Sequence, residues 1–241
     1  MDDDSRTTKR YLSGDYLSHN PTWDSEDAPW KAGLIREVLA AHGLRPHSIA
    51  DVGCGAGAVL REMRRAFPEA RLAGFDVSPD ARRFWTEAPA LKIEFSVGDF
   101  FTLARPGYDL ALVLDVIEHL PNPFDFLERL RGFAAHYVFH FPLDLSAISV
   151  LRESPLLYSR RKVGHLHYYT KELALALLAD CGYDVIEARY TGAAFTAPQR
   201  TWAARIAGPA RHLAFALSKD WGVRLLGGET LMVLARPGTT P

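Results

Sequence analysis

The sequence predicts an α/β fold in which a mostly parallel β-sheet carries helices on both faces. Short apolar runs alternate with amphipathic segments through the middle of the chain, and this alternation is typical of parallel strands joined by crossover helices. Glycines 53, 55 and 57 follow the first apolar run directly, as expected where a strand turns sharply into a helix. Both features predict an open sheet with a binding edge at the carboxyl ends of its strands.

The individual elements follow from apolar spacing and from helix start and stop signals. Ser78-Pro79 and Asn122-Pro123 each place a capping side chain before a proline, which favours a helix beginning at that point. Two further strands after residue 182 complete a sheet that ends in an antiparallel pair. The expected helices are 34–42, 58–67, 79 onward, 123–131 and 170–181, and the expected strands are 49–52, 71–77, 92–97, 108–114, 137–141, 183–190 and 231–235.

Two segments interrupt this rhythm. Residues 143–169 are too long for an ordinary connection and are expected to form an irregular loop, and residues 193–228 match no pattern that we can assign. The second segment includes residues 200–219, where apolar and basic side chains mix. This stretch fits a helix packed over a pocket, or a surface that touches a membrane or another subunit.

Composition narrows the classes of protein that fit. The chain has 241 residues, 48% of them hydrophobic, and a formal net charge of -1, which suits one globular domain and argues against broad binding to nucleic acid. No apolar run is long enough to span a bilayer, and the start of the chain, residues 1–4, is acidic where a signal peptide would be basic. Cys54 and Cys181 lack metal-ligand spacing and are expected to be reduced thiols. We therefore expect a cytoplasmic protein, and oligomer formation stays open.

The glycine turn at residues 51–57, Asp-Val-Gly-Cys-Gly-Ala-Gly, fits more than one function. It also satisfies the glycine pattern of dinucleotide sites, and it could be a tight turn without a ligand. Two observations argue against a dinucleotide site. Asp51 stands just before the glycines, where its negative charge would repel the phosphates, and no second mononucleotide half follows.

Three further acids stand at the ends of successive expected strands, and such acids should converge at one edge of the sheet. Asp76 could accept hydrogen bonds from both ribose hydroxyls of a nucleoside. Asp99, followed by Phe100, could take the amino protons of an adenine that the aromatic ring flanks. Asp115 follows the fourth strand, where the reactive end of the ligand should lie. Alone, each acid could equally be a solvated loop residue or a helix cap.

Together these residues resemble the class I S-adenosylmethionine-dependent methyltransferases, and most closely their small-molecule types 11 and 23. The resemblance covers residues 30–190 and is strongest over 49–123, where the glycine turn, Gly98-Asp99-Phe100 and Asp-Val-Ile-Glu-His-Leu at 115–120 match family motifs. It implies a Rossmann-like seven-stranded sheet with an antiparallel last strand. It also implies S-adenosylmethionine as cofactor and S-adenosylhomocysteine as product.

By this resemblance the glycines line the methionine part of the cofactor and Asp51 binds its ammonium group. Asp76 holds the ribose, Asp99 the adenine amino group, and the Phe100 backbone the ring. The segment 1–30 would close over the cofactor, with residues 20–23 and 29–31 in the stretch that resembles the leading segment of relatives. The full implied set is Asp51, Gly53, Cys54, Gly55, Gly57, Asp76, Val77, Asp99, Phe100, Asp115 and Val116.

Candidates for the acceptor side are three histidines. His119 follows the fourth strand and could take a proton from a hydroxyl, or simply cap the junction. His165 and His167 alternate on a stretch expected to be extended, so they would face the same side, as pocket residues or as ordinary surface histidines. His140, inside the fifth strand, is expected to be a hydrogen-bonded core residue.

Other features of the acceptor side are less specific. Asp115, Glu118 and His119 resemble the acid-x-x-Glu-His pattern of some metal-assisted methyltransferases, but so short a motif predicts no metal by itself. Basic residues in the long connection could attract an anionic substrate, or could be a solvated charge run. They are Arg152, Arg160, Arg161 and Lys162.

We therefore expect one domain over residues 1–241 that methylates a small molecule, most simply at oxygen, with the insertions 143–169 and 193–228 capping the acceptor side. The string at 114–120 lacks the Asn-Pro-Pro-Tyr pattern of enzymes that methylate nucleobase amines. Methylation of RNA or protein is the first alternative. A cofactor-binding module without turnover is the second.

Overall fold

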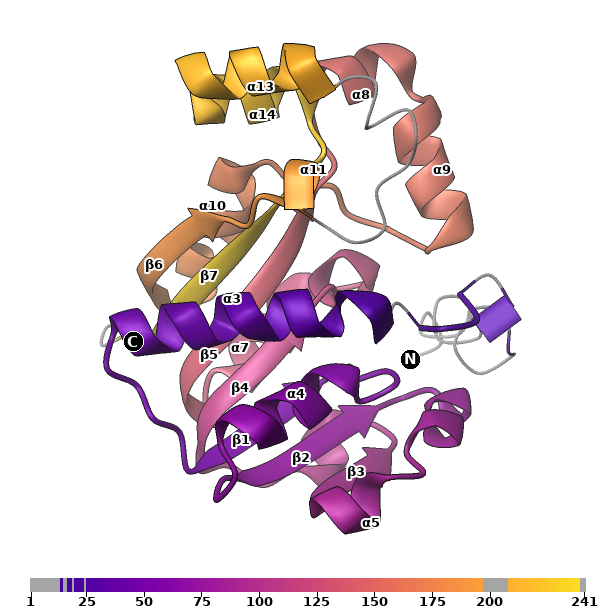
Figure 1. The fold of residues 1–241 in the computed structure, drawn as a ribbon, viewed down its shortest axis with the longest axis vertical. Helices are drawn as coiled ribbons and strands as arrows, with labels where there is room; N and C mark the ends of the chain where they lie inside the picture. Colours follow the sequence, from indigo (N-terminus) through magenta and orange to yellow (C-terminus); the bar gives the residue numbers. More distant parts are fainter. Residues whose placement is uncertain (1–13, 15–16, 19, 24, 197–207, 239–241) are drawn as a thin grey trace.

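A seven-stranded sheet forms the centre of the molecule, with strand order β3-β2-β1-β4-β5-β7-β6 (Figure 1). The computed structural model describes residues 14, 17–18, 20–23, 25–196 and 208–238. Neighbours from β3 to β5 pair in parallel, whereas β7 is antiparallel to both β5 and β6, so the predicted fold class is confirmed. The strands are β1 (Ser48–Val52), β2 (Arg71–Asp76), β3 (Ile93–Val97), β4 (Tyr108–Leu114), β5 (Ala134–Leu143), β6 (Tyr183–Tyr190) and β7 (Glu229–Pro237).

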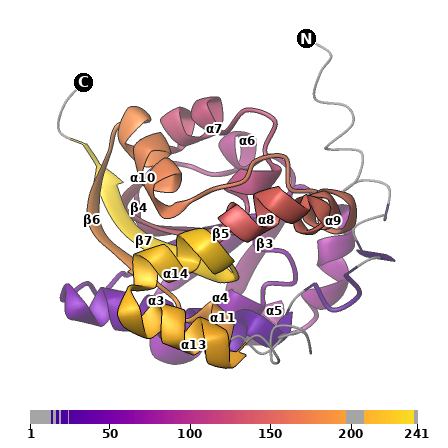
Figure 2. The same cartoon turned by 90° about the horizontal axis from the view of Figure 1, so that it is seen from above.

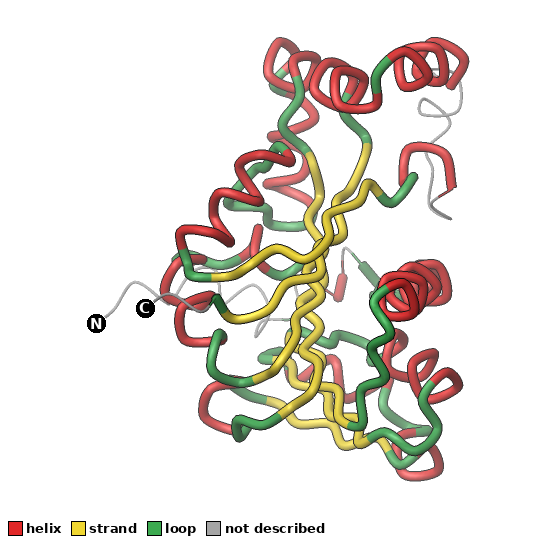
Figure 3. The backbone as a smooth tube through the Cα atoms, turned by 90° about the vertical axis from the view of Figure 1, so that its left-hand side faces the viewer, coloured by secondary structure: helices red, strands yellow, loops and turns green. Residues whose placement is uncertain are grey.

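Helices cover both faces of the sheet, as its edge-on view shows (Figure 3). Successive side chains of a strand point to opposite faces, and in β1 Ile49 packs with one hydrophobic cluster and Ala50 with the other. One face packs against α3 (Ala28–Ala41) and α4 (Ala58–Ala66). The other face packs against α7 (Pro123–Leu130) and α10 (Lys171–Asp180). The sheet is therefore buried on both sides, which leaves its carboxyl edge as the place for a site.

Short helices follow three strands at that edge, namely η2 (Pro79–Phe84) after β2, α6 (Phe100–Leu103) after β3 and η3 (Ile117–His119) after β4. Two others lie elsewhere in the order, η1 (Ser25–Asp27) before α3 and α5 (Ala88–Leu91) before β3. The Asn122 side chain accepts a hydrogen bond from the backbone of Asp125, which confirms the predicted cap of α7. The Ser78 hydroxyl makes no such bond. Its backbone N–H donates to Asp76 instead, so the carboxylate organises this turn.

The long connection after β5 is helical, so the expected irregular loop is wrong. It contains α8 (Ala147–Arg152) and α9 (Ser154–Lys162). Ser146 and Ser149 cap α8 reciprocally, a local signal that the apolar pattern alone does not reveal.

The second insertion also consists of helices where it is described, namely α11 (Ala193–Thr196), α13 (Gly208–Leu217) and α14 (Lys219–Leu226). Helix α14 packs against α8, and the two insertions lie together at one end of the molecule, beyond the carboxyl end of β5 (Figures 1 and 2). The first part of the stretch 200–219 falls outside the described residues. Among the helices that are described, none is both long and apolar enough to cross a bilayer.

Candidate active site

A cavity of about 730 Å³ opens at the carboxyl ends of β1 to β4. All the predicted cofactor residues except Gly57 line it, so side chains from four strand ends do converge on one space, as open α/β sheets require. These lining residues are Asp51, Gly53, Cys54, Gly55, Asp76, Val77, Asp99, Phe100, Asp115 and Val116.

The glycine turn brings the backbone to the cavity wall. Gly53 and Gly55 have positive φ angles of 75° and 50°, which favour glycine. A Cβ at Gly53 would lie 2.6 Å from Val116, and one at Gly55 would lie 2.6 Å from Trp23. Gly57 is not among the lining residues, although Ala56 and Ala58 on either side of it are. It precedes α4, and its missing side chain makes room for the ring of Phe95. Its contact with the cofactor stays a prediction.

Asp76 joins the two turns that border the cavity. The carboxylate is buried at the end of β2, where Oδ2 accepts the Gly55 N–H and Oδ1 the Ser78 N–H, both at 2.8 Å. Each oxygen retains a lone pair for a ligand. Asp76 therefore fixes the shape of the site and can also contact what binds there.

Asp51 lies beside it and is only 3% exposed. Burial, reinforced by the negative charge of Asp76, raises the pKa of Asp51 to about 7, although Lys31 opposes the shift. A carboxyl group in this state takes up or releases a proton near neutral pH, and a bound cation would favour its charged form.

Asp99 begins α6 and lines the same cavity. Its side chain accepts hydrogen bonds from the backbone of Phe101 and from the hydroxyl of Thr102. Asp99 therefore both caps α6 and lines the cavity, so the two roles considered for it are compatible. Cys54 and Cys181 are both buried and free, as predicted, and burial raises the pKa of the Cys54 thiol well above its ordinary value.

Asp115 is the centre of a partly buried ionic cluster at the cavity wall, and its side chain is 29% exposed. Its Oδ2 lies 2.6 Å from Lys31 Nζ, and its Oδ1 accepts a 2.6 Å hydrogen bond from His140 Nδ1. Burial alone would raise the pKa of Asp115, but His140 and Lys31 outweigh it and hold that pKa far below its usual value. His140 is a buried, hydrogen-bonded residue as predicted, with Nε2 bonded to Thr230.

Asp115 therefore pairs with Lys31 and His140 and not with Glu118 and His119, the other members of its sequence motif. Both of its oxygens are engaged, and the potential metal-ligand group found among the described residues contains Glu118, His119 and His165 but not Asp115. The group that the structure brings together therefore differs from the motif read along the sequence, because Asp115 pairs with Lys31 and His140 whereas His165 joins Glu118 and His119.

The acceptor end of the cavity is formed by His119 and by the start of α7. Of the three predicted histidines, only His119 lines the cavity. His165 donates to Asp144 at 2.6 Å and His167 to the Leu120 carbonyl at 3.0 Å, so both stand behind the wall. The basic residues predicted to attract a substrate do not line the cavity either, because they lie on α8 and α9.

Several wall residues come from outside the motifs. Trp23 and Lys31 belong to the leading segment and line the cavity, in agreement with the resemblance of that segment. Phe126 and Arg129 of α7 were not predicted. The sequence signal for them is their spacing of three, which places both on one helix face beside the apolar stripe.

Comparison with solved structures first defines the class. The plantazolicin methyltransferase crystallised with S-adenosylhomocysteine shares 18% identity, with a TM-score of 0.63 over 96% of this chain and 93% of that one. Magnesium protoporphyrin IX methyltransferase from Synechocystis shares 16% identity, with a TM-score of 0.56 over 85% of this chain and 80% of that one. With the sheet and the cavity described above, these matches define the Rossmann-like fold of class I methyltransferases.

Sequence comparison then shows which known domain the central part of the chain resembles. Residues 50–136 match the family model described as a methyltransferase domain. A malonyl-[acyl-carrier protein] O-methyltransferase from Hahella chejuensis is 50% identical over 54 residues, or 20% of this chain. A ubiquinone biosynthesis O-methyltransferase from Roseobacter denitrificans is 28% identical over 141 residues, or 55% of this chain. The chain spans only 19% and 52% of the lengths of these two relatives. The chain therefore has the fold of class I methyltransferases, and its residues 50–136 match a methyltransferase domain by sequence.

Proposed function

We propose that this protein transfers a methyl group from S-adenosylmethionine to an oxygen atom of a small molecule. The observation that carries the proposal is the convergence of Asp51, Asp76 and Asp99 with the glycine turn on one cavity whose other end is lined by His119. Bound S-adenosylmethionine supplies an electrophilic methyl group on a positively charged sulfur. A cavity with several carboxylates favours such a cation.

The residues present fit this ligand. Because Gly53 and Gly55 have no side chains, the space next to their backbone stays open. Asp51 stands where an ammonium group can pair with it. Asp76 keeps lone pairs for two hydroxyls, and Asp99 can accept from an amino group. These contacts hold the donor in place, and in methyl transfer orientation accounts for much of the rate enhancement, on the order of 7 kcal/mol in favourable cases.

An acceptor oxygen fits the other end. His119 can bind or deprotonate a hydroxyl, and Phe126 offers an apolar wall for the body of the acceptor. Both sequence relatives are named O-methyltransferases. The volume of about 730 Å³ suits a nucleoside-sized donor together with a small acceptor. RNA is disfavoured as a substrate by the net charge of -1.

The chain acts as one domain in this proposal. The segment 1–30 serves as a lid over the cofactor, a role supported by the position of Trp23 in the cavity wall. The insertions 143–169 and 193–228 are proposed to cap the acceptor side. Their helices α8 and α14 pack against each other, although none of their described residues lines the cavity.

Calorimetric titration tests the donor. S-adenosylhomocysteine is expected to bind the full-length protein at micromolar concentrations, whereas NADH is not, because a second nucleotide half is absent. Absence of binding at millimolar S-adenosylhomocysteine would refute the proposal, and tight NADH binding would favour the dinucleotide alternative. Labelled methyl donor with a panel of small hydroxylated molecules then tests turnover. Label found only in RNA or protein would support the macromolecular alternative, and binding without any turnover would support the non-catalytic one.

A second prediction concerns pH. With the pKa of Asp51 at about 7 in the ligand-free protein, the cationic ligand should lower that pKa and release a proton on binding. Affinity for S-adenosylhomocysteine should rise about tenfold between pH 5.5 and 7.5. Calorimetry in buffers of different ionisation enthalpy measures the released proton. Asp51→Asn should abolish the release, and a release unchanged in this variant would assign the proton to another group.

The same shift fixes the sign of the effect on the ligand-free fold. The pKa of Asp51 is higher in the folded protein than the ordinary aspartate value of 3.8, so between these two values the folded state binds more protons than the unfolded state. Its contribution to stability is therefore fully present below pH 3.8 and is lost as pH rises through about 7. Thermal unfolding with and without the ligand should show opposite trends with pH.

A further inference from the structure

A buried carboxylate beside the cavity has no hydrogen-bond partner in the described part of the chain. Glu118 lies in η3, directly after β4, and is 0% exposed. Neither of its carboxylate oxygens accepts a hydrogen bond from any described residue. A carboxylate without exposure and without a hydrogen-bond partner is costly to bury unless something positive compensates its charge.

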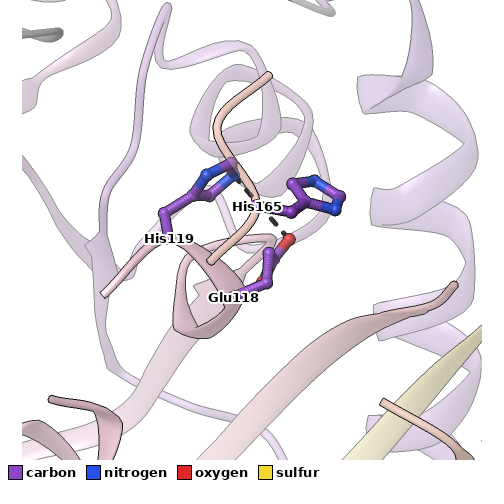
Figure 4. A group of neighbouring side chains, drawn as sticks. All are labelled: Glu118, His119 and His165. Atoms are coloured by element: carbon purple, nitrogen blue, oxygen red, sulfur yellow. Dashed lines mark ion pairs between the residues drawn. The ribbon is translucent and has the colours of Figure 1, made fainter. Parts of the chain in front are cut away.

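Two imidazoles face this carboxylate (Figure 4). One donor atom from each of Glu118, His119 and His165 lies within 4.8 Å of the others. His119 Nε2 is 3.9 Å from Glu118 Oε1, and the rings of His119 and His165 meet edge to face with centroids 4.9 Å apart. The donors come from two segments that are 46 positions apart in the sequence, so the fold rather than the local motif builds the group.

The surrounding structure holds these donors in place. His165 Nδ1 donates to Asp144 Oδ2 at 2.6 Å, which leaves Nε2 as the lone-pair nitrogen. A histidine fixed by a carboxylate in this way is the usual arrangement behind a metal ion. The backbone carbonyl of Glu118 accepts the N–H groups of Leu166 and His167 at 2.7 and 3.1 Å, so the two segments are tied together at the cluster.

We propose that Glu118, His119 and His165 bind a divalent transition-metal ion. Two imidazole nitrogens and one carboxylate oxygen form the ligand set of many zinc sites with an open position, and they also suit Fe²⁺, Co²⁺ and Mn²⁺. His119 is the member of the group that lines the cavity, so we expect the open position to be reached from there. Asp115 lies outside the set of donor atoms that are within 4.8 Å of one another, and its oxygens pair with Lys31 and His140.

The ion gives the acceptor end a chemical role, and this step rests on the proposed function. An ion held by these residues would lower the pKa of an acceptor hydroxyl, whose proton would leave to water. The deprotonated oxygen would form its bond to the methyl carbon as the bond from that carbon to sulfur breaks, which would give the methyl ether and S-adenosylhomocysteine with no change in the charge of the ion. In this arrangement His119 would be a metal ligand and not a base.

Metal binding can be measured without turnover. Full-length protein stripped with a chelator is titrated with Zn²⁺ by calorimetry and with Co²⁺ by visible absorption, and bound metal is counted after dialysis. We expect one equivalent of metal and Co²⁺ bands typical of nitrogen and oxygen ligands. Glu118→Gln and His165→Ala should each weaken binding by at least about 100-fold, and Asp144→Asn, which acts through His165, by about 10- to 100-fold.

The matched control is His42→Ala. His42 forms another histidine–glutamate pair, with Glu187 at 2.8 Å, but outside this cluster, so its loss should leave metal affinity unchanged. S-adenosylhomocysteine binding in the same samples reports on folding and on the donor site. The metal inference is overturned if the wild-type protein retains no equivalent of metal, or if His165→Ala and Asp144→Asn bind it as tightly as the wild type. In that event normal S-adenosylhomocysteine binding would leave the proposed function intact.

Discussion

Replacing Asp115 by asparagine is expected to lower the free energy of unfolding by about 3 kcal/mol. The change removes the carboxylate charge that lies 2.6 Å from the Lys31 ammonium and that accepts from His140. The Lys31 and Asp115 side chains are 15% and 29% exposed, so the expected cost is at the low end of the range for buried pairs, because much of the Lys31 charge stays desolvated. Asparagine is the suitable replacement, since Asp115 has a φ of 54° and asparagine tolerates that region well.

Urea unfolding followed by circular dichroism measures this effect, with Asp184→Asn as the control. Asp184 pairs with Arg236 at 3.6 Å on the surface, where the two side chains are 47% and 55% exposed, so its loss should cost less than about 1 kcal/mol. Equal effects of the two substitutions would contradict a buried cluster at Asp115.

The pH dependence has a defined sign. The folded protein holds the pKa of Asp115 far below the ordinary aspartate value of 3.8. The stabilising contribution of this carboxylate is therefore fully present above pH 3.8 and is lost as the pH falls below that value. The difference between wild type and Asp115→Asn should therefore persist from pH 8 to pH 5 and shrink in stronger acid.

The donor half of the site was predictable because it depends on local order along the chain. A parallel strand exposes its carboxyl end at one edge, so an acid placed directly after an apolar run has a known position. Asp76 and Asp99 lie where this rule places them. The glycine turn follows the same logic for Gly53 and Gly55, but not for Gly57, whose role depends on the ring of Phe95 from a strand that is distant in sequence.

The acceptor half was less predictable because it depends on contacts across the chain. Lys31 meets Asp115 across 84 positions, and no spacing rule indicates such a pair. The sequence singled out His119 and His165 separately, but only the fold brings their rings together. The connection 143–169 looked irregular because α8 and α9 are short. The capping serines of α8 are a weak signal without tertiary context, and the side chain of Glu153, which precedes α9, makes no capping hydrogen bond.

Asp76→Ala is expected to weaken binding of S-adenosylhomocysteine by about 100-fold, or ~2.7 kcal/mol. In the proposed complex the carboxylate accepts two hydroxyl hydrogen bonds, and bonds to a charged group contribute about 1.5–3 kcal/mol each. The substitution also frees the N–H groups of Gly55 and Ser78 that the carboxylate holds, so the turn around the ligand loses order. Calorimetry gives the affinity and thermal unfolding gives the accompanying loss of stability.

Asp109→Ala is the control that separates the loss of affinity from the loss of stability, because it removes a comparable carboxylate from the opposite end of the sheet. Oδ2 of Asp109 accepts the backbone N–H groups of His47 and Ser48 at 2.7 and 2.9 Å, and Asp109 does not line the cavity. It should lower stability and leave affinity unchanged. An analogue of S-adenosylhomocysteine without ribose hydroxyls completes the cycle: if Asp76 contacts those hydroxyls, the analogue should bind wild type and Asp76→Ala with similar affinity. A full 100-fold difference for the analogue would instead mean that Asp76 acts only through the shape of the turn.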